Sequence, residues 1–157
     1  MGLLGTFDGR MDPQARIVIP QRFREAVESG MVLARGLDKC IEAYPPLEWE
    51  QLANRVKQFS PFDPNSRLLR RLTFSGAFNA SLDRAGRIVL PLYLRQYAGI
   101  EEDVILTGED TFFDIWAPGE WREQEAKAGQ LGQIAQGLER PGEGQGRGTE
   151  SLERGRA

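Results

Sequence analysis

Two pairs of aspartate and arginine, each four residues apart, are the side chains in this sequence best placed to do chemistry. Asp12 precedes Arg16 and Asp83 precedes Arg87, and each pair leads into an aliphatic run that ends in proline. An aspartate at such a turn accepts backbone hydrogen bonds. An arginine at the start of a strand can reach phosphates or base edges. A purely structural ion pair is the alternative. We expect the aspartates to stabilise the turns and the arginines to contact nucleic acid.

Further arginines flank both pairs and could supply salt-sensitive phosphate contacts. They are Arg10, Arg22, Arg24, Arg84 and Arg95. The net charge of the chain is −3, but residues 1–100 carry fourteen Lys and Arg against ten Asp and Glu. The acids concentrate in residues 101–125, which hold nine of them and one Arg. The first hundred residues can therefore present a basic face, although genomic base composition could also explain the abundance of arginine.

Both pairs belong to an internal repeat. Residues 7–20 return as residues 78–91 at an offset of 71, and the match resumes at an offset of 72, where Trp49 corresponds to Trp121. The duplicated unit has about fifty residues, and we divide the chain into four parts. These are a first repeat over 1–58, a helical connector over 59–73, a second repeat over 74–128 and a Gly-rich tail over 129–157. The composition of the tail predicts disorder from about residue 141.

Each repeat predicts the same succession of elements: a strand, a turn, a β-branched strand ending in proline, a short helix, a hairpin and a helix entered through proline. The short helices are expected over 21–28 and 92–98, and the hairpin strands near 31–35, 40–44, 104–107 and 112–116. The last helix could continue from Pro118 to Leu138, weakened by three glycines. One such unit is small for an independent core. Two copies can bury their apolar faces in one closed pseudo-dimeric barrel, which makes the expected class α+β, mainly β, with appended helices.

Several functions are disfavoured by what the sequence lacks. It contains no histidine, so a histidine-based acid–base pair or triad is excluded. Cys40 lies in an apolar segment and is expected to pack, and the consecutive acids at 101–103 resemble a solvated loop. We find no nucleotide-binding motif and no metal-ligand spacing. We therefore expect no catalytic residues, no cofactor and no metal site. No apolar run is long enough for a membrane span and no signal peptide is evident, which favours the cytoplasm.

On these residues the sequence resembles the MraZ family of the AbrB/SpoVT-like superfamily, over about residues 1–125. The paired Asp-x-x-x-Arg motifs carry the resemblance, together with residues 63–72, 83–99 and 113–116. It implies a duplicated swapped-hairpin barrel in which Asp12, Arg16, Asp83 and Arg87 form the DNA-binding motifs. It also implies a bacterial regulator of the division and cell-wall gene cluster. Pro13, inside the first motif, departs from the family pattern.

The same resemblance implies the partners of the chain. These are double-stranded DNA upstream of its own operon, bound at short tandem repeats, and further copies of the chain in a ring-like homo-oligomer. It implies a nucleoid-associated protein with no membrane and no small-molecule substrate. The alternative is an AbrB-type antitoxin or a general DNA-binding interaction protein, with the tail as a possible toxin-binding segment. The duplication within one chain favours the MraZ type.

Overall fold

The computed structural model describes residues 2–138. The chain divides into two compact units, Met1–Arg122 and Glu123–Ala157, and the second is described only as far as residue 138. The disorder expected from about residue 141 therefore lies outside the described residues. Within the described part of the chain, no helix is both long enough and apolar enough to cross a bilayer. The α+β class with a mainly antiparallel sheet is confirmed.

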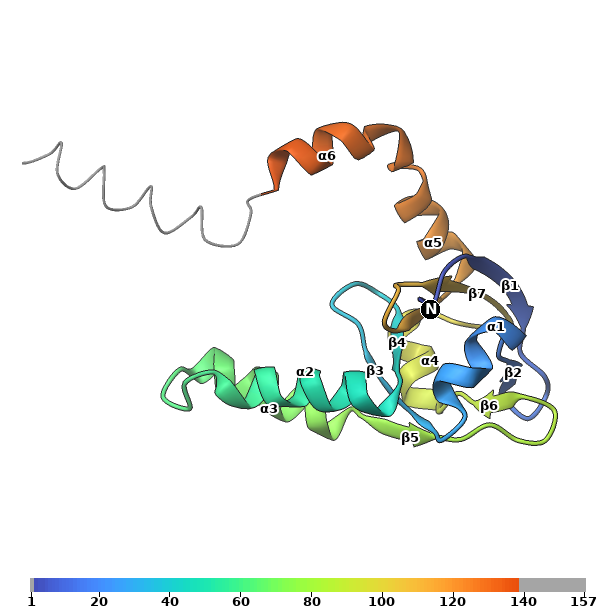
Figure 1. Cartoon of the computed structure of the whole chain (residues 1–157), viewed down its shortest axis with the longest axis horizontal. Helices are drawn as coiled ribbons and strands as arrows, with labels where there is room; N and C mark the ends of the chain where they lie inside the picture. The colour runs from blue at the N-terminus through green and yellow to red at the C-terminus, as the bar shows by residue number, and fades with distance from the viewer. Residues whose placement is uncertain (1, 139–157) are drawn as a thin grey trace, which may run out of the picture. The chain divides into compact units, whose positions relative to one another are not determined.

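The elements follow the repeated order that the sequence predicts (Figure 1). The strands are β1 (Thr6–Arg10), β2 (Arg16–Val18), β3 (Met31–Arg35), β4 (Ile41–Tyr44), β5 (Phe78–Ala80), β6 (Arg87–Val89), β7 (Asp103–Gly108) and β8 (Phe113–Trp116). The helices are α1 (Gln21–Arg24), α2 (Pro46–Gln58), α3 (Pro64–Ser75), α4 (Leu92–Ala98), α5 (Pro118–Glu125) and α6 (Leu131–Gly137). The first short helix spans the expected residues only in part as α-helix, since it continues as the 3-10 helix η1 (Glu25–Val27).

The main sheet exchanges its edge strands between the two halves of the chain. Its order is β1-β7-β8-β4-β3-β5, and all its pairs are antiparallel. The early strand β1 pairs with β7, far along the chain, and the late strand β5 pairs with β3. The hairpins meet at the centre, where β4 pairs with β8. Neither half therefore completes its sheet without the other.

The expected closed barrel is wrong, because the sheet of the described residues stays open between β1 and β5. The turns at Asp12 and Asp83 carry the chain away from these edge strands, and β2 and β6 pair only with each other. Each of the two strands has three residues and is soon followed by proline, which cannot donate a ladder hydrogen bond. The β2–β6 ribbon nevertheless completes the core, since Ile17 and Ile88 are buried in the same apolar cluster as the sheet.

One face of the sheet forms the principal core. Alternate strand residues such as Leu33, Ile41 and Phe113 point to it, as the period of two requires. The short helices close this face with Phe23 and Leu94, both fully buried. Helix α4 ends at Gly99, which adopts a left-handed conformation that glycine tolerates best.

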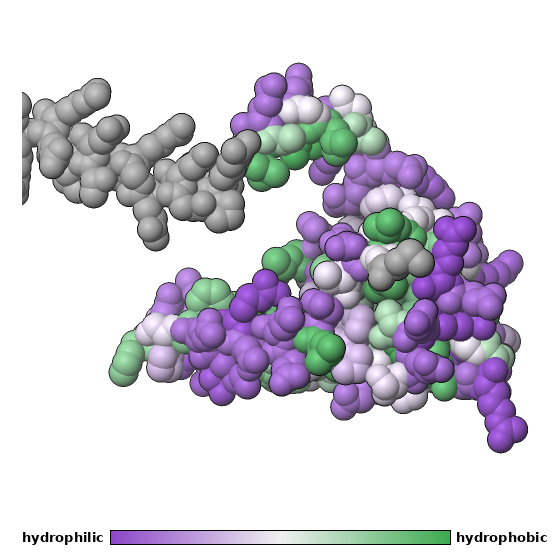
Figure 2. Space-filling model, viewed as in Figure 1, coloured by the Kyte–Doolittle hydropathy of each residue, from purple (hydrophilic) through white to green (hydrophobic). Residues whose placement is uncertain are grey.

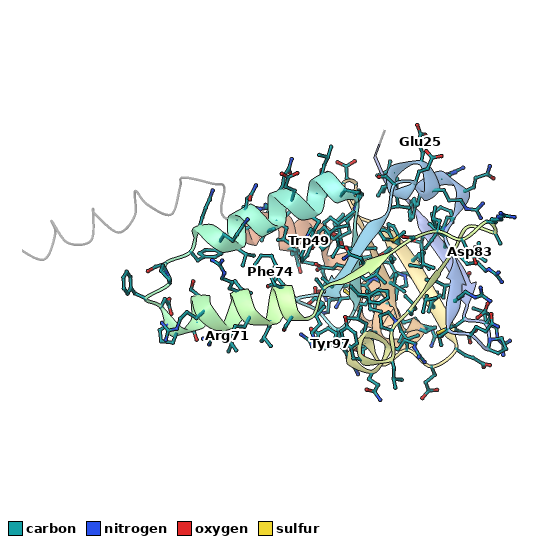
Figure 3. All side chains as sticks on the ribbon, turned by 90° about the horizontal axis from the view of Figure 1, so that it is seen from below. Glu25, Trp49, Arg71, Phe74, Asp83 and Tyr97 are labelled. Carbon is teal, nitrogen blue, oxygen red and sulfur yellow. The ribbon has the colours of Figure 1, made fainter. Side chains whose placement is uncertain are left out.

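Helices α2 and α3 form a hairpin that projects from the sheet (Figure 1). Pro64 opens α3, and the Asp63 carboxylate accepts a hydrogen bond from the backbone N–H of Asn65, as expected for a helix start. The rings of Trp49 and Phe74 pack edge to face across the hairpin, 6.1 Å apart (Figure 3). Figure 2 shows apolar surface toward the outer tip of the hairpin. The exposed large apolar side chains of the hairpin are Leu47, Phe59, Phe62, Leu68, Leu69 and Leu72.

The helix that begins at Pro118 does not continue to Leu138 without a break. Helix α5 ends at Glu125, and the 3-10 helix η2 (Ala128–Gln130) separates it from α6. Gly129 lies in this break, where glycine lowers helix stability. Within the described part of the chain, α6 buries none of its side chains.

Candidate nucleic-acid interface

Two equivalent turns, each closed by an aspartate, position the candidate site. The Oδ1 atom of Asp12 accepts hydrogen bonds from the backbone N–H groups of Gln14 and Arg16, both at 2.9 Å. Asp83 does the same for the second turn, accepting from Ala85 and Arg87 at 2.9 Å. Each turn also accepts a hydrogen bond from the other half of the chain, since the Ile19 N–H donates to the Gly86 carbonyl and the Leu90 N–H donates to the Ala15 carbonyl, both at 2.8 Å. The aspartates therefore fix the points at which β2 and β6 begin.

The β2–β6 ribbon has one buried and one outward face. Ile17 lies opposite Ile88, and both are almost completely buried. The neighbouring positions point the other way, so that Arg16 lies opposite Val89 and Arg87 lies opposite Val18. Both valines are about half exposed. The outer face thus presents two arginines and two apolar side chains in a two-fold pattern. The two valines were not among the residues expected at the site, although their alternation with the arginines is visible in the sequence.

Four charged side chains form one cluster on this face. Arg87 Nε lies 3.0 Å from Asp83 Oδ2, and Arg16 Nε lies 3.5 Å from its own motif partner, Asp12 Oδ2. The arginines also reach across the ribbon. Arg16 Nη1 lies 3.5 Å from Asp83 Oδ2, and Arg87 Nη1 lies 3.5 Å from Asp12 Oδ2. All four side chains are about 30 % exposed, at 27–33 %. The cluster is neutral and sits at the surface, where ion pairs contribute little to stability.

Backbone hydrogen bonds keep both carboxylates ionised. The N–H of Arg16 lowers the pKa of Asp12 below its ordinary value of 3.8, and the N–H of Arg87 lowers the pKa of Asp83 in the same way. The neighbouring guanidinium groups lower both values further. At neutral pH both aspartates are therefore negatively charged, and they orient the two arginines through ion pairs.

Two more arginines are held at equivalent places by backbone carbonyls. Arg24 Nε donates to the carbonyl of Ile19, and Arg95 Nε donates to that of Leu90, both at 2.9 Å. The guanidinium of Arg24 also lies against Gly86, where an added Cβ would be 2.4 Å from Arg24 Cζ. The structure therefore brings Arg24 next to the second turn, on the other half of the chain.

The three remaining candidates, Arg10, Arg22 and Arg84, are exposed. Arg10, at the end of β1, bridges to Glu102 at 3.0 Å, with both side chains more than 60 % exposed. Arg84 occupies the second turn and Arg22 lies on α1. The pairing with Glu102 reduces the positive charge that Arg10 can offer. Sequence reasoning missed this partner because 92 residues separate the two.

Removing the carboxylate of Asp83 should unfold the protein at lower temperature. Asp83→Ala leaves the N–H groups of Ala85 and Arg87 without their acceptor, so we expect a loss of several degrees in melting temperature. Asp83→Asn keeps an oxygen at this place and should lose less. Thermal unfolding followed by circular dichroism measures both.

The effect of Asp83→Ala should also depend on pH. Because the pKa of Asp83 is lowered in the folded protein, its stabilisation is present above the ordinary value of 3.8 and lost as pH falls through the lowered one. The gap between the wild type and Asp83→Ala should therefore close on strong acidification. An alanine variant as stable as the wild type at neutral pH would contradict the turn-stabilising role.

A third experiment uses the unequal residues at the third position after each aspartate. Gly86 has a φ of 73°, and Ala15 adopts a φ of 61° at the equivalent place. Gly86→Ala should lose about 1–2 kcal/mol in the free energy of unfolding, since an L-residue is strained there, and its Cβ would also displace Arg24. Ala15→Gly should be neutral or slightly stabilising, because released strain offsets the chain entropy of glycine. Denaturant unfolding of both variants checks this, and equal losses would contradict it.

Comparison with known proteins finds the same family in both halves of the chain. The model of the MraZ protein family, described as antitoxin-like, matches twice, over residues 3–72 and 73–139. A protein of Thermomicrobium roseum is 43 % identical over 136 residues, covering 86 % of this chain and 96 % of the relative. Relatives from a Roseiflexus species and from Herpetosiphon aurantiacus are 40 % and 42 % identical over 119 residues, covering 76 % of this chain and 83 % of each relative. All three are named transcriptional regulator MraZ.

Proposed function

The chain belongs to the MraZ family, and on that premise we propose that it is a transcriptional regulator that binds double-stranded DNA through the outer face of the β2–β6 ribbon. One observation carries the proposal: Arg16 and Arg87 lie diagonally across the outer face of a surface ribbon, and each is oriented by both carboxylates. A two-stranded ribbon fits the major groove of B-DNA. Arginines held there in advance lose little side-chain entropy on binding.

The residues of the ribbon and its surroundings make different kinds of contact with DNA. Arg16 and Arg87 donate to guanine edges or phosphates, and the exposed Val18 and Val89 contact thymine methyl groups. The flanking arginines contact phosphates and set the affinity and its salt dependence. These are Arg10, Arg22, Arg24, Arg84 and Arg95. Asp12 and Asp83 stay with the turns, because a carboxylate facing a phosphate is repulsive.

We assign the fold to the swapped-hairpin type of the AbrB/SpoVT-like superfamily, with repeats over 1–58 and 74–128. The exchange of β1 and β5 between the two halves supports this assignment, as does the double match of the family model. One polypeptide then forms the same unit that a dimer of a single-repeat chain would form. The ribbon lies on the pseudo-two-fold axis of this unit.

The operator proposed is a set of short tandem boxes upstream of the chain's own operon, in the division and cell-wall gene cluster. A homo-oligomeric ring of chains binds it in the nucleoid, and no catalysis is involved. One ribbon touches few base pairs, and each good contact discriminates by only ~1–3 kcal/mol. Several linked ribbons are needed to select one site in a genome.

A gel-shift assay with DNA from upstream of the chain's own gene tests the function. We expect a defined complex that is tighter than with unrelated DNA of equal length, measured at two salt concentrations. The logarithm of the binding constant should fall linearly with the logarithm of the salt concentration. Equal binding to both DNAs would point instead to a general DNA-binding protein, and the lack of a complex with either would overturn the proposal.

The family description favours one further candidate, an antitoxin activity. An antitoxin would be recovered in a stable complex with a toxin encoded beside it. Co-expression with the neighbouring gene products, followed by purification, separates this function from operator binding alone.

A further inference from the structure

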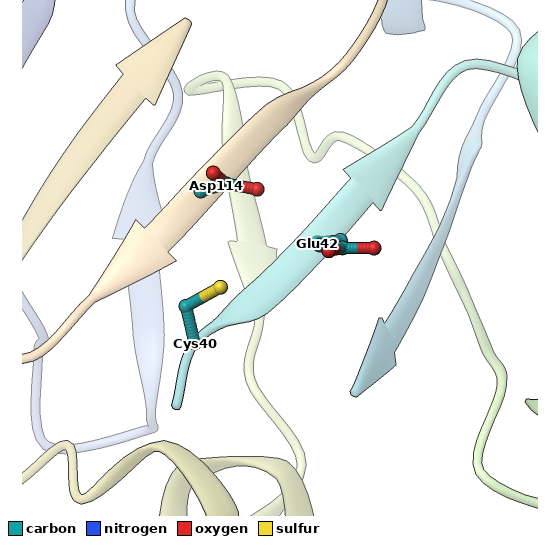
Figure 4. Close-up of side chains that lie close together, drawn as sticks. All are labelled: Cys40, Glu42 and Asp114. Carbon is teal, nitrogen blue, oxygen red and sulfur yellow. The ribbon is translucent and has the colours of Figure 1, made fainter. Parts of the chain in front are cut away.

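Three potential metal ligands meet on the sheet, away from the arginine ribbon. Glu42 in β4 lies directly opposite Asp114 in β8, and Cys40 immediately precedes β4 on the same side of the sheet (Figure 4). One thiol or carboxylate atom from each of the three lies within 4.8 Å of the others. At the repeat offset of 72, Glu42 and Asp114 occupy equivalent positions, so the pseudo-two-fold axis brings the two carboxylates together.

One oxygen of the buried Asp114 carboxylate lacks a hydrogen-bond partner in the described part of the chain. Its side chain is 4 % exposed, and its Oδ1 atom has no hydrogen-bond partner among the residues that the structure describes. Glu42 accepts a hydrogen bond from the hydroxyl of Tyr44. Like charges directly opposite each other destabilise a sheet, and an unpaired buried charge costs more still. A cation bound between the facing carboxylates would supply a partner for Asp114 Oδ1.

We propose that Cys40, Glu42 and Asp114 form a binding site for a divalent transition-metal ion, with Zn²⁺ the best match. A thiolate beside two carboxylates suits zinc, whereas an all-oxygen set would favour magnesium or calcium. Ligand atoms within 4.8 Å need only a small approach to reach bond lengths of about 2.0–2.3 Å around one ion. The fourth position falls to water or to the carboxylate of Glu109.

An ion at this place would join the two halves of the chain. Cys40 and Glu42 come from the first half of the chain, and Asp114 comes from β8 in the second half. The ion would therefore bridge β4 and β8, which are neighbours at the centre of the sheet. The site is structural in this role and does not depend on DNA binding. Its failure would leave the proposed function intact.

Metal titration of the untagged full-length chain, first stripped with a chelator, tests the site. The chain contains no histidine, so no imidazole competes for the ion. We expect one Co²⁺ per chain with a thiolate-to-cobalt charge-transfer band in the near ultraviolet, and a higher melting temperature on addition of Zn²⁺. Cys40→Ser should abolish the band, and Asp114→Asn should weaken metal binding by at least ~100-fold.

Asp114→Asn keeps the test decisive, because the amide is isosteric and carries no buried charge. We expect this variant to fold, and to melt without metal at least as high as the wild type, yet to gain nothing from Zn²⁺. Asp8→Asn, an exposed substitution on β1, is the matched control and should respond to Zn²⁺ as the wild type does. A wild type that binds no stoichiometric metal, or a charge-transfer band that survives in Cys40→Ser, would overturn the proposal.

Discussion

Replacing Arg16 and Arg87 together by alanine should lower the affinity for operator DNA by roughly 100-fold or more. Each lost bidentate contact costs ~1–3 kcal/mol, and a tenfold change in affinity corresponds to about 1.4 kcal/mol. The melting temperature should hardly change, because the ion pairs of both arginines lie at the surface and the turns keep their aspartates. Fluorescence anisotropy at constant salt, beside thermal unfolding, measures both quantities.

The matched control for this double variant is Arg55→Ala. Arg55 is exposed on α2, so its loss removes one arginine charge, against two in the double variant, without touching the ribbon. We expect little change in operator affinity for this control. If the double variant instead loses melting temperature in proportion to affinity, Arg16 and Arg87 are structural residues and the proposed interface is wrong.

Placing charges on the exposed apolar stripe of α3 should separate the chains of the proposed oligomer. Leu68 and Leu72 are each about half exposed, one helical turn apart on a helix that buries none of its side chains within one chain. Leu68→Glu with Leu72→Glu should give a monomer that binds a single DNA box normally. Its affinity for three tandem boxes should fall by ~10²–10⁴-fold, because linked contacts become independent ones.

Light scattering and binding to one, two and three boxes test this expectation. Leu37→Glu is the control, since Leu37 is also apolar and is 94 % exposed, but lies in the β3–β4 loop. A wild type that is monomeric and binds one box as tightly as three would refute the proposed assembly. A charged double variant that still forms the same oligomer would place the interface elsewhere, such as on α6.

The local elements could be read from the sequence because each has a short-range cause. Proline at residues 46, 64 and 118 opens three helices, and alternating apolar residues give the strands. Closure of the barrel was predicted wrongly, because it depends on whether β1 and β5 meet. Whether β1 and β5 meet depends on the direction that the chain takes after the turns at Asp12 and Asp83. The residue pattern does not predict this direction.

The candidate site divides in the same way. The hydrogen bonds of Asp12 to its own turn span four residues and follow from the motif. The hydrogen bond from Arg87 to Asp12 joins residues 75 positions apart in the sequence and requires the β2–β6 register. Cys40 was expected only to pack, since nothing in the sequence places Asp114 beside it. Contacts between residues from the two halves of the chain are those that the sequence did not predict.

The two ends of the ribbon have the same backbone conformation but different side chains. Pro13 in the first turn corresponds to Arg84 in the second, and Arg22 on α1 corresponds to Tyr93 on α4. A perfectly symmetric dimer is matched to palindromes and cannot distinguish the two orientations of its site. If the ribbon binds DNA as proposed, its unequal ends give the bound chain a polarity along the DNA axis. Successive chains bound through the ribbon would all face the same way, so the spacing and direction of one box would dictate those of the next.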